Sequence, residues 1–420
     1  MRITISETPS SQPAIEYKSQ LMCHFCLNQA RHLFHQYYHH GYQQTIYYCR
    51  SCITQSVHSR KYIHYLKTAQ FAENIVIDLP FELTAQQSKA SQFIVNKFEQ
   101  RKSCLLYAVT GAGKTEMILA GIVAARAQGC NVAVVSPRTD VVKELSLRLS
   151  QYLKTDYLCT LYGGHAEITS DYFIISTIHQ LMYFQDHFDL IIIDEIDAFP
   201  VGYDPRLIRL LNRALTEHGM FVYLSATPPK YIMQACKTST IYLPLRYHQR
   251  PLPVPRFKFM SKGAVEHKMS TLLAHAQCDE IILIFFHDIK LMEATYTRLN
   301  QHLQRHTVCV YSTDVERHEK VEAIRNKTYR FIFTTTILER GFTMQDLSVW
   351  VMNSHLFRSD SLIQIAGRVD RKGNKQNGEV IFYHDGISLS MLDALKKIRQ
   401  MNKRGAHDTS ALYHMSSTDS

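Results

Sequence analysis

Short apolar runs alternate with helical patterns over most of the chain. From about residue 81 the runs are SCLLYAV, NVAVVSP, YFIIST, FDLIIIDE and MFVYLSAT, separated by stretches with helical spacing of the apolar residues. Runs of this length that are bounded by turns are typical of strands buried on both faces of a parallel sheet. The pattern therefore predicts an α/β domain with a doubly wound parallel sheet.

A second set of strand-like runs follows a proline-rich segment. Residues 244–257, PLRYHQRPLPVPRF, contain four prolines and four basic residues, a composition that suits neither a central strand nor a helix. Beyond this segment come IILIFF, TVCVYS, YRFIFTTT, LSVWVMNS and EVIFYH. We interpret the segment as a linker between two α/β domains.

The two ends of the chain differ in composition from the α/β part. Polar residues dominate both termini, whereas Cys, His and Tyr are concentrated before the first domain. We expect a flexible N-terminus at 1–20, a four-cysteine module at 21–66, α/β domains at 67–245 and 246–405, and a disordered tail at 406–420.

Charge and hydropathy limit the class of protein. The chain carries 47 lysines and arginines against 37 acids, a net charge of +10, which favours a polyanionic partner such as nucleic acid or an anionic membrane surface. No apolar run approaches the roughly 18 residues of a membrane-spanning helix, and the N-terminus lacks the apolar core of a secretory signal. We therefore expect a cytoplasmic protein, which can still dock on a membrane protein.

The stretch AVTGAGKTE, residues 108–116, resembles a phosphate-binding loop. Gly113, Lys114 and Thr115 fit the pattern G-x-x-x-x-G-K-[ST], although alanine holds its first position. A strand-like run precedes the loop and a helical pattern follows it, which is the context that the motif requires. Gly111 and Gly113 allow backbone N–H groups to face phosphates, while Lys114 would reach the β- and γ-phosphates and Thr115 would bind Mg²⁺. The alternative is an ordinary strand–turn–helix that happens to contain a lysine.

Two acids end a strand-like run about eighty residues downstream. In FDLIIIDEID, Asp194 stands where the strand ends and is placed to hold Mg²⁺ through water. Glu195 beside it can polarise an attacking water. Paired acids after a strand are common, so the assignment depends on the phosphate-binding loop upstream.

A basic segment in the second domain would complete the site. In QIAGRVDRKG, residues 364–373, Gln364, Arg368 and Arg371 recur at i, i+4 and i+7, which predicts that they share one face of a short helix. Fixed guanidinium groups would supply positive charge where negative charge develops on the γ-phosphate. The alternative is a solvated basic face that only binds phosphate backbone.

Four of the ten cysteines are arranged in pairs. Cys23 with Cys26 and Cys49 with Cys52 form two C-x₂-C pairs, 22 residues apart, a spacing typical of a closed structural Zn²⁺ site. One of the histidines between them, His32, His35, His39 or His40, is a less favoured substitute ligand. The aromatic and basic residues between the pairs either stack on nucleic-acid bases or form the small core of the module.

Together with SAT at 225–227 and TTTILERGFT at 334–343, these motifs resemble the core of superfamily 2 helicases, in which the phosphate-binding loop commonly begins with alanine. The resemblance implies two RecA-like domains with ATP in the cleft between them. It also implies that Gln87 of FELTAQQ reads adenine, with Gln86 as the near alternative. The other nucleotide contacts that it implies are Ala112, Glu116, Gly341 and Gln364.

The four-cysteine module in front of this core narrows the resemblance. Over about residues 20–405 the chain resembles the late competence protein ComFA family of naturally transformable Gram-positive bacteria, through SPRTDVVKEL, LYGGH, STIHQLMYF, IIDEIDAFP, LSATPP and GEVIFYHDG. The resemblance implies a single-stranded-DNA-dependent ATPase on the inner face of the cytoplasmic membrane, beside the DNA channel, with a phosphoribosyltransferase-like ComFC partner. Its strand contacts would include Arg138, Gly163 and Thr177. Asp370, between the two arginines, replaces the small residue expected there and would soften the arginine finger.

Two other functions remain open at this stage. A replication-restart helicase of the PriA type also carries zinc, but its zinc ligands are inserted within the helicase core, and it has an additional N-terminal DNA-binding domain. A non-catalytic, zinc-containing DNA-binding scaffold is the third hypothesis, and the intact Lys114, Asp194, Glu195, Arg368 and Arg371 argue against it. ATP hydrolysis with and without single-stranded DNA discriminates among these functions.

Overall fold

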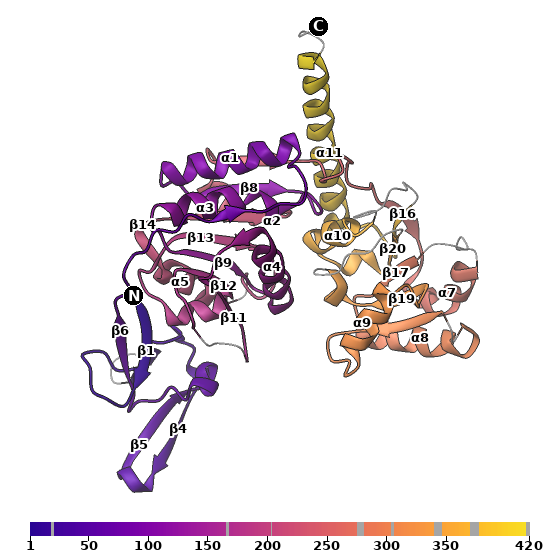
Figure 1. Cartoon of the computed structure of the whole chain (residues 1–420). Helices are drawn as coiled ribbons and strands as arrows, with labels where there is room; N and C mark the ends of the chain where they lie inside the picture. Colours follow the sequence, from indigo (N-terminus) through magenta and orange to yellow (C-terminus); the bar gives the residue numbers. More distant parts are fainter. Residues whose placement is uncertain are drawn as a thin grey trace. The chain divides into compact units, whose positions relative to one another are not determined.

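The computed structural model describes residues 1–17, 21–164, 168–202, 204–274, 281–303, 306–339, 347–369 and 378–416. It consists of two compact units (Figure 1). The first comprises Met1–Leu106 and Lys114–Ile241, and the second comprises Tyr107–Gly113 and Tyr242–Ser420, so the boundary passes through two strands, β8 and β15. No helix in the described part of the chain is long and apolar enough to cross a bilayer.

The first unit is built on a seven-stranded sheet with the order β11-β12-β9-β13-β14-β8-β15. Its strands are β8 (Cys104–Ala108), β9 (Val132–Ser136), β11 (Leu158–Leu161), β12 (Phe173–Thr177), β13 (Phe188–Asp194), β14 (Leu215–Ser225) and β15 (Thr240–Leu243). The pairs β11–β12, β12–β9, β9–β13 and β13–β14 are parallel. All residues of β8, β9 and β12 are buried, as their unbroken apolar runs predict. The predicted parallel sheet is confirmed.

Helices cover this sheet. They are α1 (Ala85–Glu99), α2 (Lys114–Met117), α3 (Leu119–Ala127), α4 (Thr139–Tyr152), η4 (Ile178–Tyr183), α5 (Pro205–Ala214) and α6 (Lys230–Ala235). The helix α5 shows why they form: Asp204 caps its N-terminus, a proline follows at the first position, and Leu207, Leu210 and Leu211 are buried at helical spacing. A short antiparallel pair, β7 (Val76–Ile77) with β10 (Leu153–Lys154), lies beside α3 and α4.

The residues before α1 form a separate small module of the first unit. Its elements are β1 (Arg2–Ser6), β2 (Ile15–Glu16), β3 (Met22–Cys23), η1 (Arg31–Leu33), β4 (Phe34–His39), η2 (His40–Tyr42), β5 (Gln44–Cys49), η3 (Arg50–Gln55) and β6 (Tyr62–Leu66). The strand β1 falls in the stretch that the sequence predicts to be flexible, and it pairs antiparallel with β6. It is ordered because Ile3 on β1 and Ile63 on β6 are both buried.

The second unit contains a six-stranded sheet with the order β16-β21-β20-β17-β19-β18, and all of its pairs are parallel. The strands are β16 (Arg256–Phe259), β17 (Ile281–Phe285), β18 (Thr307–Val310), β19 (Phe331–Thr334), β20 (Leu347–Val351) and β21 (Val380–His384). Five of them are the predicted apolar runs. The sixth, β16, begins inside the predicted linker, whose residues 244–255 contain neither strand nor helix.

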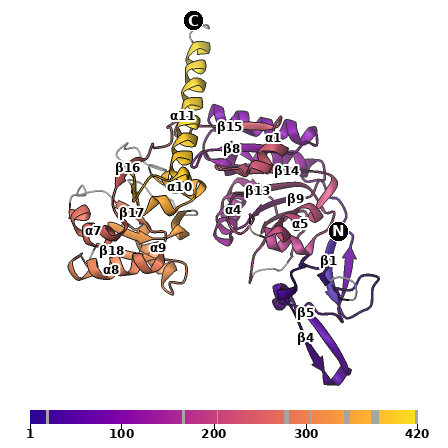
Figure 2. The ribbon, with the colours of Figure 1, turned by 180° about the vertical axis from the view of Figure 1, so that it is seen from behind.

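The helices of the second unit are η5 (Lys262–Ala264), α7 (Val265–Ala274), α8 (Ile289–Leu303), α9 (Arg317–Arg325), η6 (Thr336–Glu339), η7 (Ser354–Leu356), α10 (Ser359–Ala366) and α11 (Leu389–Ser416). Met269 of α7 and Met292 of α8 pack in one core with alternate strand residues such as Ile284 and Phe333. The helix α11 extends to Ser416, through much of the tail that the sequence predicts to be disordered. Seen from behind, α11 rises from the second unit beside α10 (Figure 2).

Candidate nucleotide site and metal centre

The loop between β8 and α2 has the backbone that phosphate binding requires. The strand β8 ends at Ala108 and α2 begins at Lys114, which gives the predicted strand–loop–helix order. Gly111 and Gly113 adopt φ angles of 83° and 77°. This left-handed region is strained for a residue with a side chain, so both glycines are needed for the path of the loop. Ala112 between them is buried.

Lys114 and Asp194 form the centre of the site in the first unit. The Nζ atom of Lys114 lies 3.2 Å from Oδ1 of Asp194, the last residue of β13. Burial raises the pKa of the Asp194 carboxyl, and the ammonium group of Lys114 opposes this effect. Thr115 is buried next to Lys114. The two motifs, eighty residues apart in the sequence, therefore meet at one edge of the sheet.

Glu195 holds an unusual backbone conformation directly after the strand. Its φ angle is 59°, in the left-handed region that residues other than glycine rarely adopt. Two hydrogen bonds hold the turn: the Glu195 N–H donates to the Leu224 carbonyl at 3.1 Å, and the Ala198 N–H donates to the Glu195 carbonyl at 2.8 Å. Such strain costs about 1–3 kcal/mol and persists only where the surrounding structure enforces it. The turn thus holds the backbone of Glu195 in one defined conformation.

Asp197 links this turn to the next strand, a connection that the sequence analysis missed. Ser225 Oγ donates to Asp197 Oδ1 at 2.6 Å, and Thr227 Oγ1 donates to Asp197 Oδ2 at 2.7 Å. Ser225 ends β14, which lies beside β13. A signal was present, because neighbouring parallel strands bring the residues after their carboxyl ends together. The SAT motif therefore fastens the DEID turn to the sheet.

Gln87 and Glu116, which are predicted to contact the nucleotide, interact with other residues of the first unit. Gln87 is buried and completes the N-terminal cap of α1, because its Oε1 accepts from the Thr84 N–H at 3.0 Å and its own N–H donates to Thr84 Oγ1. Glu116 is buried on α2, and its Oε1 lies 3.6 Å from a guanidinium nitrogen of Arg148. Both side chains thus also have structural roles.

The residues predicted in the second unit are only partly described. Gln364 and Arg368 are buried. The helix α10 ends at Ala366, with Gly367 as its C-cap, so Arg368 lies beyond the helix and the predicted common helical face is wrong at this point. Glycine disfavours a continued helix because its backbone loses more conformational freedom on folding than that of other residues. Gly341, Asp370 and Arg371 lie outside the described residues.

The four paired cysteines form a buried cluster. Their sulfur atoms all lie within 4.8 Å of one another, and Cys26 Sγ is 3.7 Å from Cys49 Sγ. Zn–S bonds of about 2.3 Å in a tetrahedron place the sulfurs about 3.8 Å apart, so the cluster fits such an ion. Hydrogen bonding among the sulfurs, first of all with Cys23, lowers the pKa of Cys49 and raises that of Cys52. A dication would allow all four to ionise together.

Supporting residues surround the cluster. Asn28 is buried, and its amide group donates to Cys49 Sγ at 3.6 Å. From α5, Arg209 donates to the Leu27 carbonyl at 2.9 Å, directly after the first cysteine pair. Arg213 donates to the carbonyls of His24 and Phe25, which lie between Cys23 and Cys26. The guanidinium groups of α5 thus anchor one side of the cluster and complement the negative charge of four thiolates.

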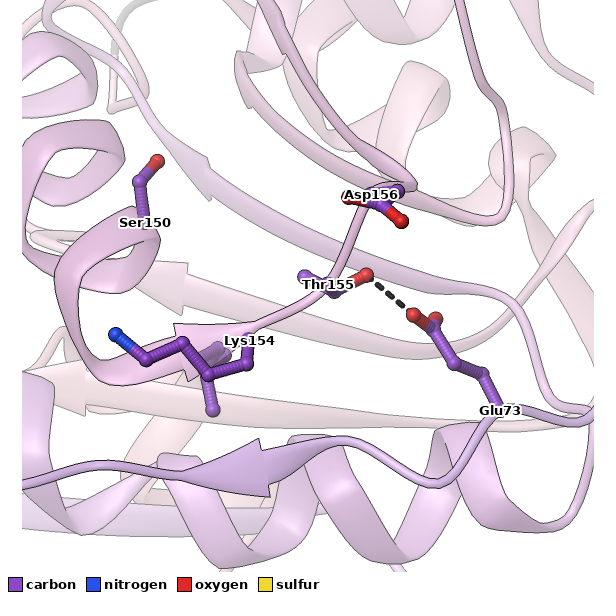
Figure 3. A pocket seen from close by; sticks show the side chains of 6 residues that line it. Glu73, Ser150, Lys154, Thr155 and Asp156 are labelled. Carbon is purple, nitrogen blue, oxygen red and sulfur yellow. Dashed lines mark hydrogen bonds between the residues drawn. The ribbon is translucent and has the colours of Figure 1, made fainter.

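A polar hollow of about 380 Å³ lies elsewhere in the first unit (Figure 3). Thr155 donates to Glu73 across it, and Glu73 also lies 3.6 Å from Nε of the buried Arg126. None of the predicted site residues lines this hollow. Its central acid supports a buried arginine, so we assign the hollow a structural role.

Three family descriptions match successive parts of the chain. Residues 4–61 match the competence protein ComFA N-terminal domain, residues 80–230 match the type III restriction enzyme res subunit, and residues 265–373 match the helicase conserved C-terminal domain. The last two place helicase domains at the two predicted α/β domains. Helicase domains of this kind imply ATP and Mg²⁺.

Solved structures share the fold at low sequence identity. Dbp5 of S. cerevisiae bound to RNA and ADP BeF3 matches with a TM-score of 0.55 and 15% identity, over 76% of this chain and 91% of that chain. RecG bound to a three-way DNA junction matches with a TM-score of 0.54 and 18% identity, over 76% of this chain and 45% of that chain. The predicted fold class, two α/β domains of the helicase core behind a four-cysteine cluster, is confirmed.

Two relatives are similar over nearly the whole chain. Competence protein ComFA of Bacillus subtilis (strain 168) is 32% identical over 406 residues, which are 93% of this chain and 87% of the relative. Competence protein ComFA of Streptococcus pneumoniae (strain ATCC BAA-255 / R6) is 33% identical over 376 residues, 85% of this chain and 86% of the relative. The resemblance drawn from the motifs is therefore confirmed, and the chain belongs to the family of ComFA competence proteins.

Proposed function

We propose that the chain is an ATPase stimulated by single-stranded DNA, which moves that strand during the uptake of transforming DNA in natural competence. The observation that carries the proposal is the Lys114–Asp194 pair at the end of the phosphate-binding loop. Without nucleotide the ammonium group and the carboxylate neutralise each other. ATP offers the lysine a phosphate, and Mg²⁺ offers the aspartate a cation, so the pair would open as the substrate binds.

The residues would divide the work as follows. Gly111, Gly113 and Lys114 would hold the phosphates, and Thr115 and Asp194 would hold Mg²⁺, which supplies charge neutralisation on the phosphates. Glu195 would orient and deprotonate the attacking water, because it directly follows Asp194 at the end of β13. From the second domain, Arg368 and Arg371 would stabilise charge on the γ-phosphate.

The four-cysteine cluster fits structural Zn²⁺ in this proposal. Cys23, Cys26, Cys49 and Cys52 would fill its coordination sphere, which leaves no position for a reacting group. The cysteines precede the helicase core, which argues against a replication-restart helicase with cysteines inside the core. By analogy with the family, the partners would be single-stranded DNA and a ComFC-like protein at the inner face of the cytoplasmic membrane.

The rate at which the protein releases phosphate from ATP distinguishes the motor from a non-catalytic DNA-binding scaffold. Turnover of ATP should rise when single-stranded DNA is added, and rise less with duplex DNA or RNA at equal nucleotide concentration. Lys114→Ala should lose turnover and retain its fold and much of its strand binding, because Lys114 would contact only nucleotide phosphates. Turnover that ignores DNA would refute the coupling, and near-normal turnover in Lys114→Ala would refute the nucleotide site.

A further inference from the structure

An exposed row of aromatic rings runs along one face of the β4–β5 hairpin. The pairing of His35 with Tyr48, and of His39 with Gln44, puts the side chains of residues 35, 37 and 39 on the same face as that of Tyr48. In Figure 1 the hairpin extends as an arm from the rest of the first unit. Tyr37 is 46% exposed and Tyr42 at the hairpin tip is 45% exposed. A cluster of exposed rings on one face of a protein is typical of a binding site.

The rings form a continuous series, which we name the aromatic ladder: His35, Tyr37, His39, Tyr42 and Tyr48. Ring centroids are 5.6 Å apart for His35 and Tyr48, 6.1 Å for Tyr37 and Tyr48, and 6.2 Å for Tyr37 and His39. The last step, from His39 to Tyr42, is 4.3 Å. The guanidinium carbon of Arg60 lies 3.4 Å from the centroid of the Tyr42 ring, so a cation ends the series.

A hollow of about 450 Å³ opens at the base of the ladder. Its lining includes the rings of His35, Tyr37, Tyr48 and His58 and the aliphatic side chains of Ile53 and Val57. The Nε2 atom of His58 lies 3.9 Å from a carboxylate oxygen of Glu7, which is 53% exposed at its side chain. This acid stands at the margin of the hollow.

The stretch of chain that contains the ladder carries no acidic residue, although Glu7 lies at the margin of the hollow. Residues 17–72 contain no aspartate or glutamate, but six lysines and arginines and seven histidines. The whole chain has 37 acids in 420 residues, which would give about five in a stretch of this length. A long acid-free stretch that presents rings and cations is the pattern of proteins that bind single-stranded nucleic acid.

We propose that the aromatic ladder is a second binding site for single-stranded DNA, in which bases stack on Tyr37 and Tyr48. The rings contact one another edge-on or at a tilt, so each base would stack on the exposed face of one ring and would not insert between two rings. Basic side chains of the module attract the phosphates. Nucleic acid is favoured over a protein partner because residues 17–72 carry cations and no acid.

This site is separate from the proposed motor, and the two have only their ligand, single-stranded DNA, in common. The ladder belongs to the N-terminal module and includes none of the nucleotide-binding residues, so it binds DNA without ATP. It would hold the strand while the helicase domains exchange nucleotide. An experiment can therefore refute the ladder proposal without refuting the motor proposal, and the reverse.

Photocrosslinking of the full-length, zinc-loaded protein tests the ladder. The probe is an oligothymidylate that carries 5-iodouracil, irradiated without nucleotide at a DNA concentration below saturation. Trypsin cuts after Arg31 and Arg50, so the peptide 32–50 contains all five ladder residues. We expect mass spectrometry to find crosslinked DNA on this peptide. Crosslinks confined to the helicase domains would overturn the proposal.

Neighbouring tyrosines supply matched variants. Tyr37→Ala should reduce the yield on peptide 32–50 by about tenfold, the effect expected when one stacked base loses its ring. Tyr38→Ala is the control, because Tyr38 is 53% exposed but lies on the opposite face of β4. Tyr37→Phe should retain the yield, since it keeps the ring. Each variant must contain one zinc and hydrolyse ATP normally without DNA.

The outcomes separate the two proposals. Equal yields for Tyr37→Ala and wild type would overturn the stacking role and leave the ladder as a surface for protein docking. A protein whose ATP turnover ignores DNA, but which still crosslinks through peptide 32–50, would refute the motor and keep the ladder. DNA-stimulated turnover without that crosslink would refute the ladder alone.

Discussion

Arg213 is the residue whose loss should separate the cysteine module from the helicase domain. Its guanidinium group donates to the carbonyls of His24 at 2.8 Å, Phe25 at 2.9 Å and Met182 at 2.8 Å. Two of these acceptors belong to the turn between the first pair of cysteines. Burial lowers the pKa of Arg213 to about 10, so the group is still charged at neutral pH. The substitution Arg213→Ala removes all three bonds at once.

The expected cost follows from these bonds. Each is worth about 1–1.5 kcal/mol net, and Nε of Arg213 is buried without a partner among the described residues, which offsets part of the gain. Only the bonds to His24 and Phe25 join the module to α5, because Met182 belongs to the helicase domain, so we expect Arg213→Ala to destabilise the docked module by about 2 kcal/mol. If zinc escapes when the module opens, a loss of this size accelerates zinc release about thirtyfold, since about 1.4 kcal/mol corresponds to a factor of ten.

Zinc transfer to a chromogenic chelator in excess measures this effect. Arg209→Ala is the matched control, because it removes the same charge from the same helix but only one hydrogen bond, to the Leu27 carbonyl. It should accelerate release only about fivefold, for about 1 kcal/mol. Equal release rates for the two variants would show that charge, and not the hydrogen bonds, holds the module. Release at the wild-type rate from Arg213→Ala would refute the anchoring altogether.

Three further outcomes are expected. Cys23→Ser with Cys26→Ser, or removal of zinc, should unfold only the N-terminal module, residues 1–66, because this module is too small to be stable without the metal; hydrogen exchange that stays protected there in zinc-free protein would contradict this. Asp194→Asn should abolish turnover yet raise the melting temperature at pH 7. Burial raises the pKa of Asp194, so the ionised carboxylate destabilises the wild-type fold at pH values above that pKa. The increase in melting temperature of Asp194→Asn over wild type should therefore shrink as the pH falls below that pKa. Arg371→Ala should bind ATP normally but resemble Lys114→Ala in turnover, since a finger acts mainly in the transition state; loss of ATP binding with normal turnover per bound nucleotide would reject that role.

The features that the sequence predicted are those set by local patterns. Unbroken apolar runs identified β8, β9, β12, β13 and β14, because strands buried on both faces need apolar residues at every position. The phosphate-binding loop and the cysteine pairs were recognisable because their chemistry demands fixed residue types at fixed spacing. Lys114 and Asp194 then met through the parallel arrangement of the sheet.

The features that the sequence analysis missed depend on neighbours far away in the chain. The strand β1 forms in a polar stretch because β6, some sixty residues later, offers it a buried pairing. The hydroxyl groups of Ser225 and Thr227 find Asp197 only once β14 lies beside β13. The end of α10 before Arg368 was locally encoded by Gly367, but the i, i+4, i+7 spacing of the basic residues suggested a longer helix. Periodicity alone does not say where a helix stops.

The arginines of α5 connect the metal centre with the nucleotide site through one short piece of chain. The strand β13 ends at Asp194, the strained turn follows, and α5 begins at Pro205. The helix that leaves the acidic turn is thus the helix that holds the cysteine module. A module attached in this way cannot detach without freeing one face of α5, whereas a module on a flexible linker would leave the turn untouched. A zinc ion in the cluster would therefore fix the β4–β5 hairpin to the domain that carries Lys114 and Asp194, and single-stranded DNA bound to the proposed ladder would stay attached to the domain with the proposed ATP site.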